Sequence, residues 1–201
     1  MLTLAIDTST STGSVAVFAF DDIVFEETFT ADRSHSSALF VTLEKAKKRA
    51  RRIDQVAIGL GPGSYAGVRI AIAGALGLQL GLGAVLVGIP SVAALATDAT
   101  SYLAVGDARR ETFYFTLVVD GICREGPTLL TEHQLRIKLD EHSTLPVLSS
   151  SGIPAFPTVQ IAAPSAAKLA RLAAAGRGIV AEGDLEPLYL REPHITQPRL
   201  Q

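Results

Sequence analysis

Apolar and polar positions along the first half of the chain follow two different periods. Three runs with strand-like character open the chain, separated by turns rich in hydroxyl side chains and aspartate. A helical stripe follows, and strand and helix patterns then alternate. The predicted elements are strands at 2–6, 14–20, 23–30, 53–59 and 84–88 and helices at 34–50, 67–82 and 90–97. This order predicts a mixed sheet with helices on its faces.

The second half has a weaker pattern. Its predicted elements are strands at 102–105, 112–119 and 146–148 and helices at 132–139 and 165–175. The change of pattern near residues 97–101 predicts two subdomains, an N-terminal one over 1–98 and a smaller, reduced one over 99–201. No internal repeat is predicted.

Composition narrows the class of protein without naming a function. Hydrophobic residues make up 48% of the 201 residues, which suits a buried α/β core, and the formal net charge of −2 does not favour general binding to nucleic acid or membranes. The single cysteine, Cys123, excludes an internal disulfide, and the chain opens with a strand pattern rather than a signal peptide. The longest apolar run, 70–78, is too short for a membrane span. We therefore expect a cytoplasmic protein.

The most informative segment is the turn at 61–64, of sequence Gly-Pro-Gly-Ser, which leads directly into a helix. Ser64 can cap the free N–H groups of the helix start and, with Arg69, face an anion. The glycines also match a loose dinucleotide-binding pattern, but no acidic residue follows the next strand until Asp98, and the Lys-Ser/Thr ending of a P-loop is missing. A tight strand-to-helix turn without a ligand is the interpretation that we favour.

The helix at 67–82 is apolar on nearly every face and rich in glycine. At 3.6 residues per turn its small residues form a stripe that another helix can approach closely. The stripe consists of Gly67, Ala71, Gly74 and Leu78, flanked by Gly77 and Gly81. The opposite face is expected to cover the sheet with Val68, Ile72, Leu76 and Leu80. Ordinary helix packing within one chain produces the same pattern.

The order of the elements resembles the actin-like ATPase fold (ASKHA, ribonuclease H-like), which implies an α/β protein with a mixed sheet, helices on its faces and two subdomains. In that fold the first hairpin carries an aspartate and then a glycine that approaches phosphate. Here Asp7 is followed by Thr8 and Ser9, and a hydroxyl-rich turn without a ligand explains these residues equally well. The candidate contacts for an anion or nucleotide are Asp7, Thr8, Ser9, Ser64 and Arg69.

Five segments, taken together and in this order, resemble the TsaB (YeaZ) family over nearly the whole chain. They are Ile6-Asp7-Thr8-Ser9-Thr10, His35-Ser36, the run 61–70, Asp107-Ala108-Arg109-Arg110-Glu111 and Pro187-Leu188-Tyr189-Leu190-Arg191. The chain departs from the family at Tyr65-Ala66, where Phe-Thr is usual, and at Ala71, where glycine is usual.

The resemblance implies a non-catalytic scaffold subunit. TsaB-like proteins pair with TsaD, the catalytic subunit that places a threonylcarbamoyl group on N6 of an adenosine of tRNA, or form a homodimer when TsaD is absent. The helices at 34–50 and 67–82 are expected to carry the interface, and replacing Gly74 with leucine is expected to block pairing with little effect on the fold. The expected interface residues are His35, Leu39, Gly67, Ile70, Ala71, Gly74, Leu78 and Gly81.

The same resemblance sets the expected ligands. No cofactor is expected on the chain alone, ATP is expected only in the assembled complex, and tRNA is contacted only through that complex. Whether a TsaE-like ATPase is a further partner stays open. No membrane partner is expected.

No catalytic or metal site is predicted. TsaD holds a metal with a His-x-x-x-His helix, whereas here Leu39 stands four residues after His35, and His133 and His142 lack the His-Glu-x-x-His zinc spacing. The alternative function is a small ATP-dependent phosphotransferase of the actin-like fold. Such an enzyme needs a second phosphate hairpin and an acidic metal or base residue, and the run 120–187 shows no convincing version of them.

A basic cluster ends the helix at 34–50. We interpret it as a solvated helix end whose charge complements the last carbonyl groups, with contact to tRNA as the alternative. Its members are Lys45, Lys47, Lys48, Arg49, Arg51 and Arg52.

Overall fold

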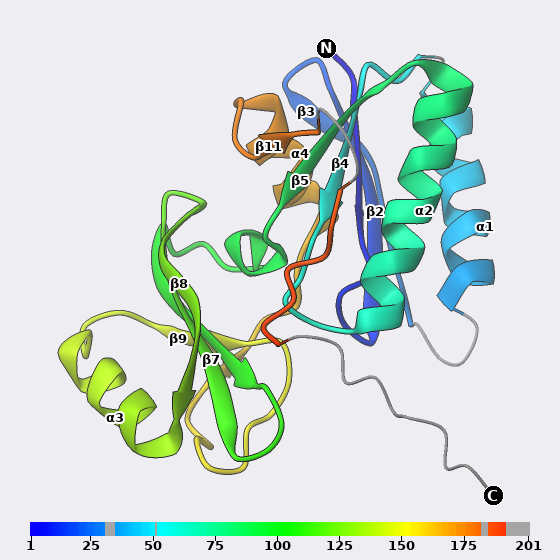
Figure 1. Cartoon of the computed structure of the whole chain (residues 1–201). Coiled ribbons are helices and arrows are strands. Elements are labelled where there is room, and N and C mark those ends of the chain that lie inside the picture. The colour runs from blue at the N-terminus through cyan, green and yellow to red at the C-terminus, as the bar shows by residue number, and fades with distance from the viewer. Residues whose placement is uncertain (31–34, 51, 182–184, 192–201) are drawn as a thin grey trace, which may run out of the picture.

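Two β-sheets lie side by side in the computed structural model, which describes residues 1–30, 35–50, 52–181 and 185–191, with only the backbone of His35 (Figure 1). The first sheet contains β1 (Thr3–Asp7), β2 (Thr12–Ala19), β3 (Asp22–Thr30), β4 (Gln55–Gly59), β5 (Val85–Ile89) and β11 (Ile179–Val180). The second contains β6 (Ser101–Asp107), β7 (Thr112–Val119), β8 (Ile122–Thr131), β9 (Val147–Ser149) and β10 (Gln160–Ile161). The helices are α1 (His35–Arg49), α2 (Tyr65–Leu82), the short 3₁₀ helix η1 (Ser91–Ala94), α3 (Glu132–Glu141) and α4 (Ala166–Ala174).

Five strands of each sheet have the same order and the same relative directions. In the first sheet they run in the order β3-β2-β1-β4-β5 and in the second in the order β8-β7-β6-β9-β10. In both, the first three strands form an antiparallel meander, and the fourth and fifth strands add in parallel beside the first. No sequence repeat was predicted, and the repeat that the structure shows is one of strand order. The two units share strand order without sharing a readable residue pattern.

Helices cover both faces of the first sheet. On one face, α1 and α2 pack over buried aliphatic side chains such as Leu4, Ile6 and Ile58 (Figure 1). On the other face, α4 packs against the small side chains Ala5 and Ala57. The small residues allow the alanine-rich helix to approach the strands closely, which explains why a helix from the second half of the chain belongs to the core of the first sheet.

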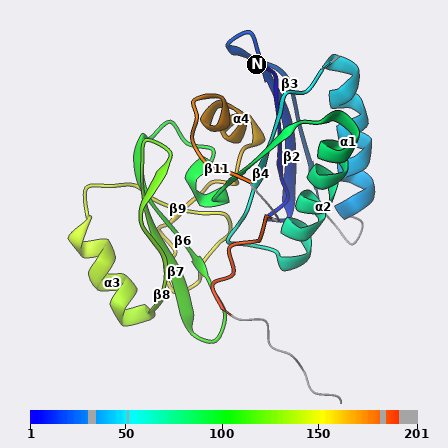
Figure 2. The ribbon, with the colours of Figure 1, turned by 45° about the horizontal axis from the view of Figure 1, so that its top comes forward.

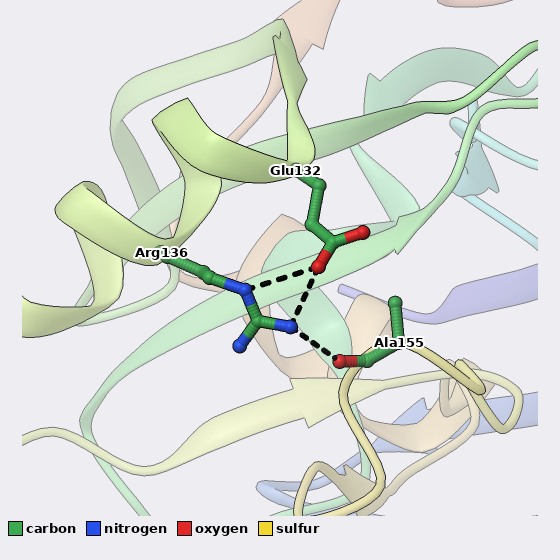
Figure 3. A network of polar contacts seen from close by, with 3 residues as sticks. All are labelled: Glu132, Arg136 and Ala155. Atoms are coloured by element: carbon green, nitrogen blue, oxygen red, sulfur yellow. Dashed lines mark hydrogen bonds and ion pairs between the residues drawn. The ribbon is translucent and has the colours of Figure 1, made fainter.

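The second sheet is covered on one face by α3 and the segment that follows β9. Arg136 of α3 donates through Nη2 to Glu132 Oε1 (2.6 Å) and to the carbonyl of Ala155 (3.1 Å), so it joins the helix to that segment (Figure 3). The Arg136 guanidinium also lies 4.8 Å from the ring centroid of Phe156. The other face of the sheet meets η1, where the Tyr102 hydroxyl donates to the carbonyl of Val92 (2.8 Å). This bond joins η1 to β6.

Helix α2 is long and apolar enough to cross a membrane by length and composition alone. One side of it packs on the first sheet and on α1, through buried residues such as Val68, Ile72 and Ala75. A helix that buries one side in its own protein and exposes an apolar other side is typical of a partner surface. The apolar character of α2 therefore does not indicate a membrane span.

Most predicted elements lie within a few residues of the observed ones, with some exceptions. The predicted helix at 90–97 shrinks to η1, and the predicted strands omit β8, β10 and β11. The predicted division between 1–98 and 99–201 falls between η1 and β6, and the sheets follow it apart from α4 and β11, which belong with the first sheet. The division itself stays a prediction.

Candidate functional site

A cleft of about 510 Å³ separates the two sheets at the carboxyl ends of four strands. The residues after β1 and β4 line it from the first sheet, and the ends of β6 and β9 line it from the second. These are equivalent strands of the repeated unit, so the two units face each other across the cleft. Carboxyl ends of strands in α/β sheets are the usual location of ligand sites. The cleft is therefore the candidate functional site.

The Gly-Pro-Gly-Ser turn forms one wall of the cleft by packing on the β1–β2 loop. A Cβ on Gly63 would lie 2.1 Å from the carbonyl oxygen of Ser9, and one on Gly67 would lie 1.9 Å from that of Thr8, so only glycine allows this contact. The N–H of Ser64 donates to the Ser9 carbonyl (2.6 Å), and the Thr8 hydroxyl donates to the Gly67 carbonyl (2.7 Å). The Ser64 side chain accepts from the Gly67 N–H, which confirms it as the cap of α2.

Asp7 lies beneath this loop and is fully buried. Its Oδ1 accepts from the N–H (2.8 Å) and hydroxyl (2.7 Å) of Ser9, while Oδ2 has no hydrogen-bond partner among the described residues. Burial raises the pKa of Asp7, and the nearby hydroxyls of Ser91 and Ser9 oppose the rise. A Cβ on Gly59 would lie 1.8 Å from Oδ2, so Gly59 makes room for the carboxyl.

Residues 185–191, here named the clasp, run from the first sheet across the cleft toward the second sheet (Figures 1 and 2). The N–H of Leu188 donates to the carbonyl of Leu60 (2.8 Å), and the ring of Tyr189 stacks on Tyr65 with centroids 5.4 Å apart. At its far end, Arg191 donates to the Thr112 hydroxyl and to the carbonyl of Arg109 (3.2 Å). The clasp therefore links both sheets.

The turn between β6 and β7 brings Arg109 to the cleft. Arg109, Arg110 and Glu111 all have positive φ, at 66°, 54° and 58°, which is an unfavourable region for side chains larger than hydrogen. The N–H of Arg109 donates to Asp107 Oδ1 (2.6 Å), which stabilises the turn. Asp107-Ala108-Arg109 therefore forms part of the cleft wall.

The candidate anion contacts divide by position. Ser9 and Ser64 line the cleft, while Asp7 and Thr8 are buried below it with hydrogen bonds inside the chain. Arg69 lies at the first turns of α2, where its Nη1 donates to the Tyr65 hydroxyl (3.0 Å) and to the Tyr189 hydroxyl (3.5 Å). An anion contact at these residues stays a prediction.

The residues expected at the partner interface also divide into two groups. Leu39, Gly67, Ala71 and Gly74 are buried within the chain, and a Cβ on Gly74 would lie 3.8 Å from Leu39, so Gly74 faces α1. Gly81 is exposed, and Ile70 and Leu78 are half-buried. The side chain of His35 lies outside the described residues. Leucine at position 74 would press on α1, so it does not test pairing alone.

The side of α2 that is exposed to solvent is not the side that was predicted to form the interface. Leu80, expected to cover the sheet, is 88% exposed, and that expectation is wrong. Ala73 and Gly77 share this exposed side, and Phe40 and Val41 of α1 are 55% and 54% exposed. We name these five residues the α1–α2 face. A shallow depression of about 310 Å³, lined in part by Val41, lies between α1 and β3.

Three members of the basic cluster have acidic partners. Lys45 pairs with Glu27 (2.7 Å), Lys48 with Glu44 (2.9 Å), and Arg52 with Asp54 (2.6 Å). These pairs favour the interpretation of a solvated helix end. Arg51 lies outside the described residues.

Several cleft residues were not predicted as site residues. Tyr114, Ser150 and Ser151 come from β7 and from the segment after β9, and burial raises the pKa of Tyr114 to about 12. Among the described residues no group of three or more His, Cys, Asp and Glu side chains is placed to hold a metal ion. The hydroxyl pair at 150–151, two residues after the predicted strand at 146–148, was a signal available in the sequence.

The sequence is similar to known proteins over much of its length. The family model described as TsaD, tRNA N6-adenosine threonylcarbamoyltransferase, matches residues 29–132. An uncharacterized protein of Mycobacterium tuberculosis is 31% identical over 94% of this chain and 92% of its own length. The tRNA threonylcarbamoyladenosine biosynthesis protein TsaB of Haemophilus influenzae is 30% identical over 58% of this chain and 53% of its length.

Solved structures show the same architecture. A Pseudomonas aeruginosa protein, described as uncharacterized with similarity to peptidase YEAZ, has a TM-score of 0.75 and 26% identity over 94% of this chain and 99% of its own. YeaZ from the same organism has a TM-score of 0.74 over the same shares at 24% identity, which supports the fold alone. The strand order and the cleft between two sheets define an α/β protein of the actin-like class. The chain belongs to the TsaB (YeaZ) family.

Proposed function

We propose that this chain is a non-catalytic partner subunit that pairs with a TsaD-type catalytic subunit and completes the complex that adds a threonylcarbamoyl group to tRNA. The proposal places it in the cytoplasm, with tRNA and ATP contacted only in the assembled complex and with a homodimer when the partner is absent. Family membership supports the pathway. The α1–α2 face is the single observation that supports pairing.

The chemistry of this face suits a helical partner. Its centre is made of the small residues Ala73 and Gly77, and a Cβ on Gly77 would meet nothing within 4 Å, so the surface there is open. Leu80 of α2 and Phe40 and Val41 of α1 add large exposed apolar side chains to it. Small residues let another helix approach closely, and large apolar residues beside them supply buried area. The face therefore fits helices that pack across α1 and α2.

Size-exclusion chromatography with light scattering tests the pairing, using this chain, TsaD from the same organism and their mixture. We expect a one-to-one heterodimer that replaces any homodimer. Leu80→Glu and Val41→Glu should each weaken it by about tenfold or more, because each buries an unpaired charge at the interface.

The matched control is Ile137→Glu on α3, which changes an exposed apolar residue on a helix over the second sheet. It should pair like the unmodified chain. If both α1–α2 variants pair normally, another surface is used. If two folded proteins form no complex with or without ATP, the chain is not a TsaD partner.

A further inference from the structure

An exposed cluster of three side chains lies where α2 begins. Arg69 donates through Nη1 to the hydroxyls of Tyr65 (3.0 Å) and Tyr189 (3.5 Å), and its guanidinium lies 5.3 Å from the Tyr65 ring centroid. Although the two rings stack, Tyr65 is 52% and Tyr189 40% exposed, and Arg69 is exposed as well. We name these three residues the Tyr-Arg cluster. Helix α2 and the clasp thus build one accessible group from positions 120 apart in the chain.

The Tyr-Arg cluster continues the α1–α2 face along the exposed side of α2. Residues four apart on a helix lie one above the other. Arg69 stands four residues before Ala73, which stands four residues before Gly77, and all three are exposed. Leu80 follows three residues later on the same side. A partner that packs along α2 over the α1–α2 face therefore reaches the Tyr-Arg cluster.

Arg69 carries a charge that its own surroundings do not neutralise. Its side-chain partners are two phenol hydroxyls, and no acidic side chain of the described residues pairs with it. The first turn of α2 contains no acidic residue either, so the positive end of the helix dipole adds to this charge. The bonds to the tyrosines use Nη1, which leaves the N–H groups on Nε and Nη2 for a further acceptor.

The side chains of the cluster suit a protein partner. Tyrosine and arginine are enriched among the residues that carry most of the binding energy at protein interfaces. Adjacent N–H groups of a guanidinium bind a carboxylate with two parallel hydrogen bonds. Arg69 is not among the residues that line the cleft, so its acceptor comes from a molecule docked on the outside of α2.

We propose that the Tyr-Arg cluster belongs to the partner-binding surface and that Arg69 binds an aspartate or glutamate side chain of the TsaD-type subunit docked on the α1–α2 face. This inference rests on the proposed function and adds to it the residue that binds the partner by charge. The clasp contributes to the same surface through Tyr189, which holds Arg69 in place.

Isothermal titration calorimetry of this chain with TsaD from the same organism tests the contact. Arg69→Gln should weaken pairing by about tenfold or more, and Arg69→Glu by more still, because glutamate repels the carboxylate. The affinity of the unmodified chain should fall as the salt concentration rises, and Arg69→Gln should reduce that dependence. A lysine substitution at one acidic residue of TsaD should restore pairing to Arg69→Glu.

Arg177→Gln is the matched control, since it removes an exposed arginine charge from the segment between α4 and β11 and should pair like the unmodified chain. Thermal unfolding of each variant confirms that it is folded. If the unmodified chain forms no complex, the proposed function itself fails. If it pairs and both Arg69 variants pair equally well, or if no lysine variant of TsaD restores pairing, only this inference is overturned. A loss in Arg69→Gln that requires ATP also overturns it, because the acceptor is then a nucleotide phosphate.

Discussion

The ring of Tyr189 stacks on the ring of Tyr65, with centroids 5.4 Å and planes 27° apart. Tyr65 is the first residue of α2, and Tyr189 belongs to the clasp, so one aromatic contact links the C-terminal segment to the helix that carries much of the α1–α2 face. Because Arg69 lies 5.3 Å from the Tyr65 ring centroid, the helix contributes a cation to the same contact.

Tyr189→Ala should loosen the clasp. The loss of the stacked ring should lower the free energy of unfolding by about 1 to 2 kcal/mol, measured by chemical denaturation. Hydrogen exchange at the Leu188 N–H, which donates to the Leu60 carbonyl, should become faster. Tyr189→Phe keeps the ring and should behave like the unmodified chain. If the Leu188 N–H exchanged as slowly in the alanine variant as in the unmodified chain, the ring stack would not hold the clasp in place.

Gly67→Ala should destabilise the protein by about 2 to 4 kcal/mol, because its Cβ would lie 1.9 Å from the Thr8 carbonyl oxygen and the backbone must shift. Gly77→Ala is the matched change on the same helix, where a Cβ meets nothing within 4 Å. It should stabilise the protein by up to about 1 kcal/mol, since alanine favours a helix over glycine. Thermal denaturation of the two variants compares them directly, and similar melting temperatures would contradict the close contact.

Asp7→Asn should make stability less dependent on pH. Burial raises the pKa of Asp7 above its ordinary value of 3.8, so the folded state holds this proton more tightly than the unfolded state. The contribution of Asp7 is therefore fully present below pH 3.8 and is lost as the pH rises through the folded pKa. Asparagine keeps the Oδ1 acceptor for Ser9 without the charge.

At neutral pH the free energy of unfolding of the Asn variant should accordingly exceed that of the unmodified chain by about 1 kcal/mol or more. In acid the two free energies should become equal. Urea titrations at a series of pH values give this difference. If the difference in unfolding free energy grew as the pH fell, the pKa of Asp7 in the folded state would be lowered rather than raised.

Thr116→Val should stabilise the protein by about 1 kcal/mol, because its fully buried hydroxyl has no hydrogen-bond partner among the described residues. Thr8→Val provides the opposite case, since the equally buried Thr8 hydroxyl donates to the Gly67 carbonyl. That variant should lose about 1 to 3 kcal/mol. Equilibrium unfolding in guanidinium chloride measures both, and a loss at Thr116 would indicate a bonded hydroxyl.

The strands and helices of the first sheet could be predicted from local patterns. Short β-rich and apolar runs indicated β1 to β5, and the cap at Ser64 was visible as a serine before an apolar helix. The strand β8 was missed because Arg124, Glu125 and a Gly-Pro pair interrupt its alternation, as is common on an edge strand that tolerates charge and bulges.

The cleft could not be assembled from the sequence. Arg109, Ser150 and Ser9 line one cleft only because two separate sheets present equivalent strand ends to each other, and no local pattern encodes that arrangement. The outward ridge of α2 was missed for a related reason. Apolar residues surround the helix, so periodicity alone could not decide whether Leu80 or Gly74 packs inside the chain.

The placement of α4 has a consequence for synthesis on the ribosome. The alanine-lined face of the first sheet is complete only when α4 docks, and the N–H of Ala166 donates to the Ser14 hydroxyl across 152 positions of the chain. Strands β1 to β5 leave the ribosome long before α4. The face of the first sheet that α4 covers therefore stays exposed until most of the chain is translated. The core of the first sheet is therefore completed only after α4 has been synthesised.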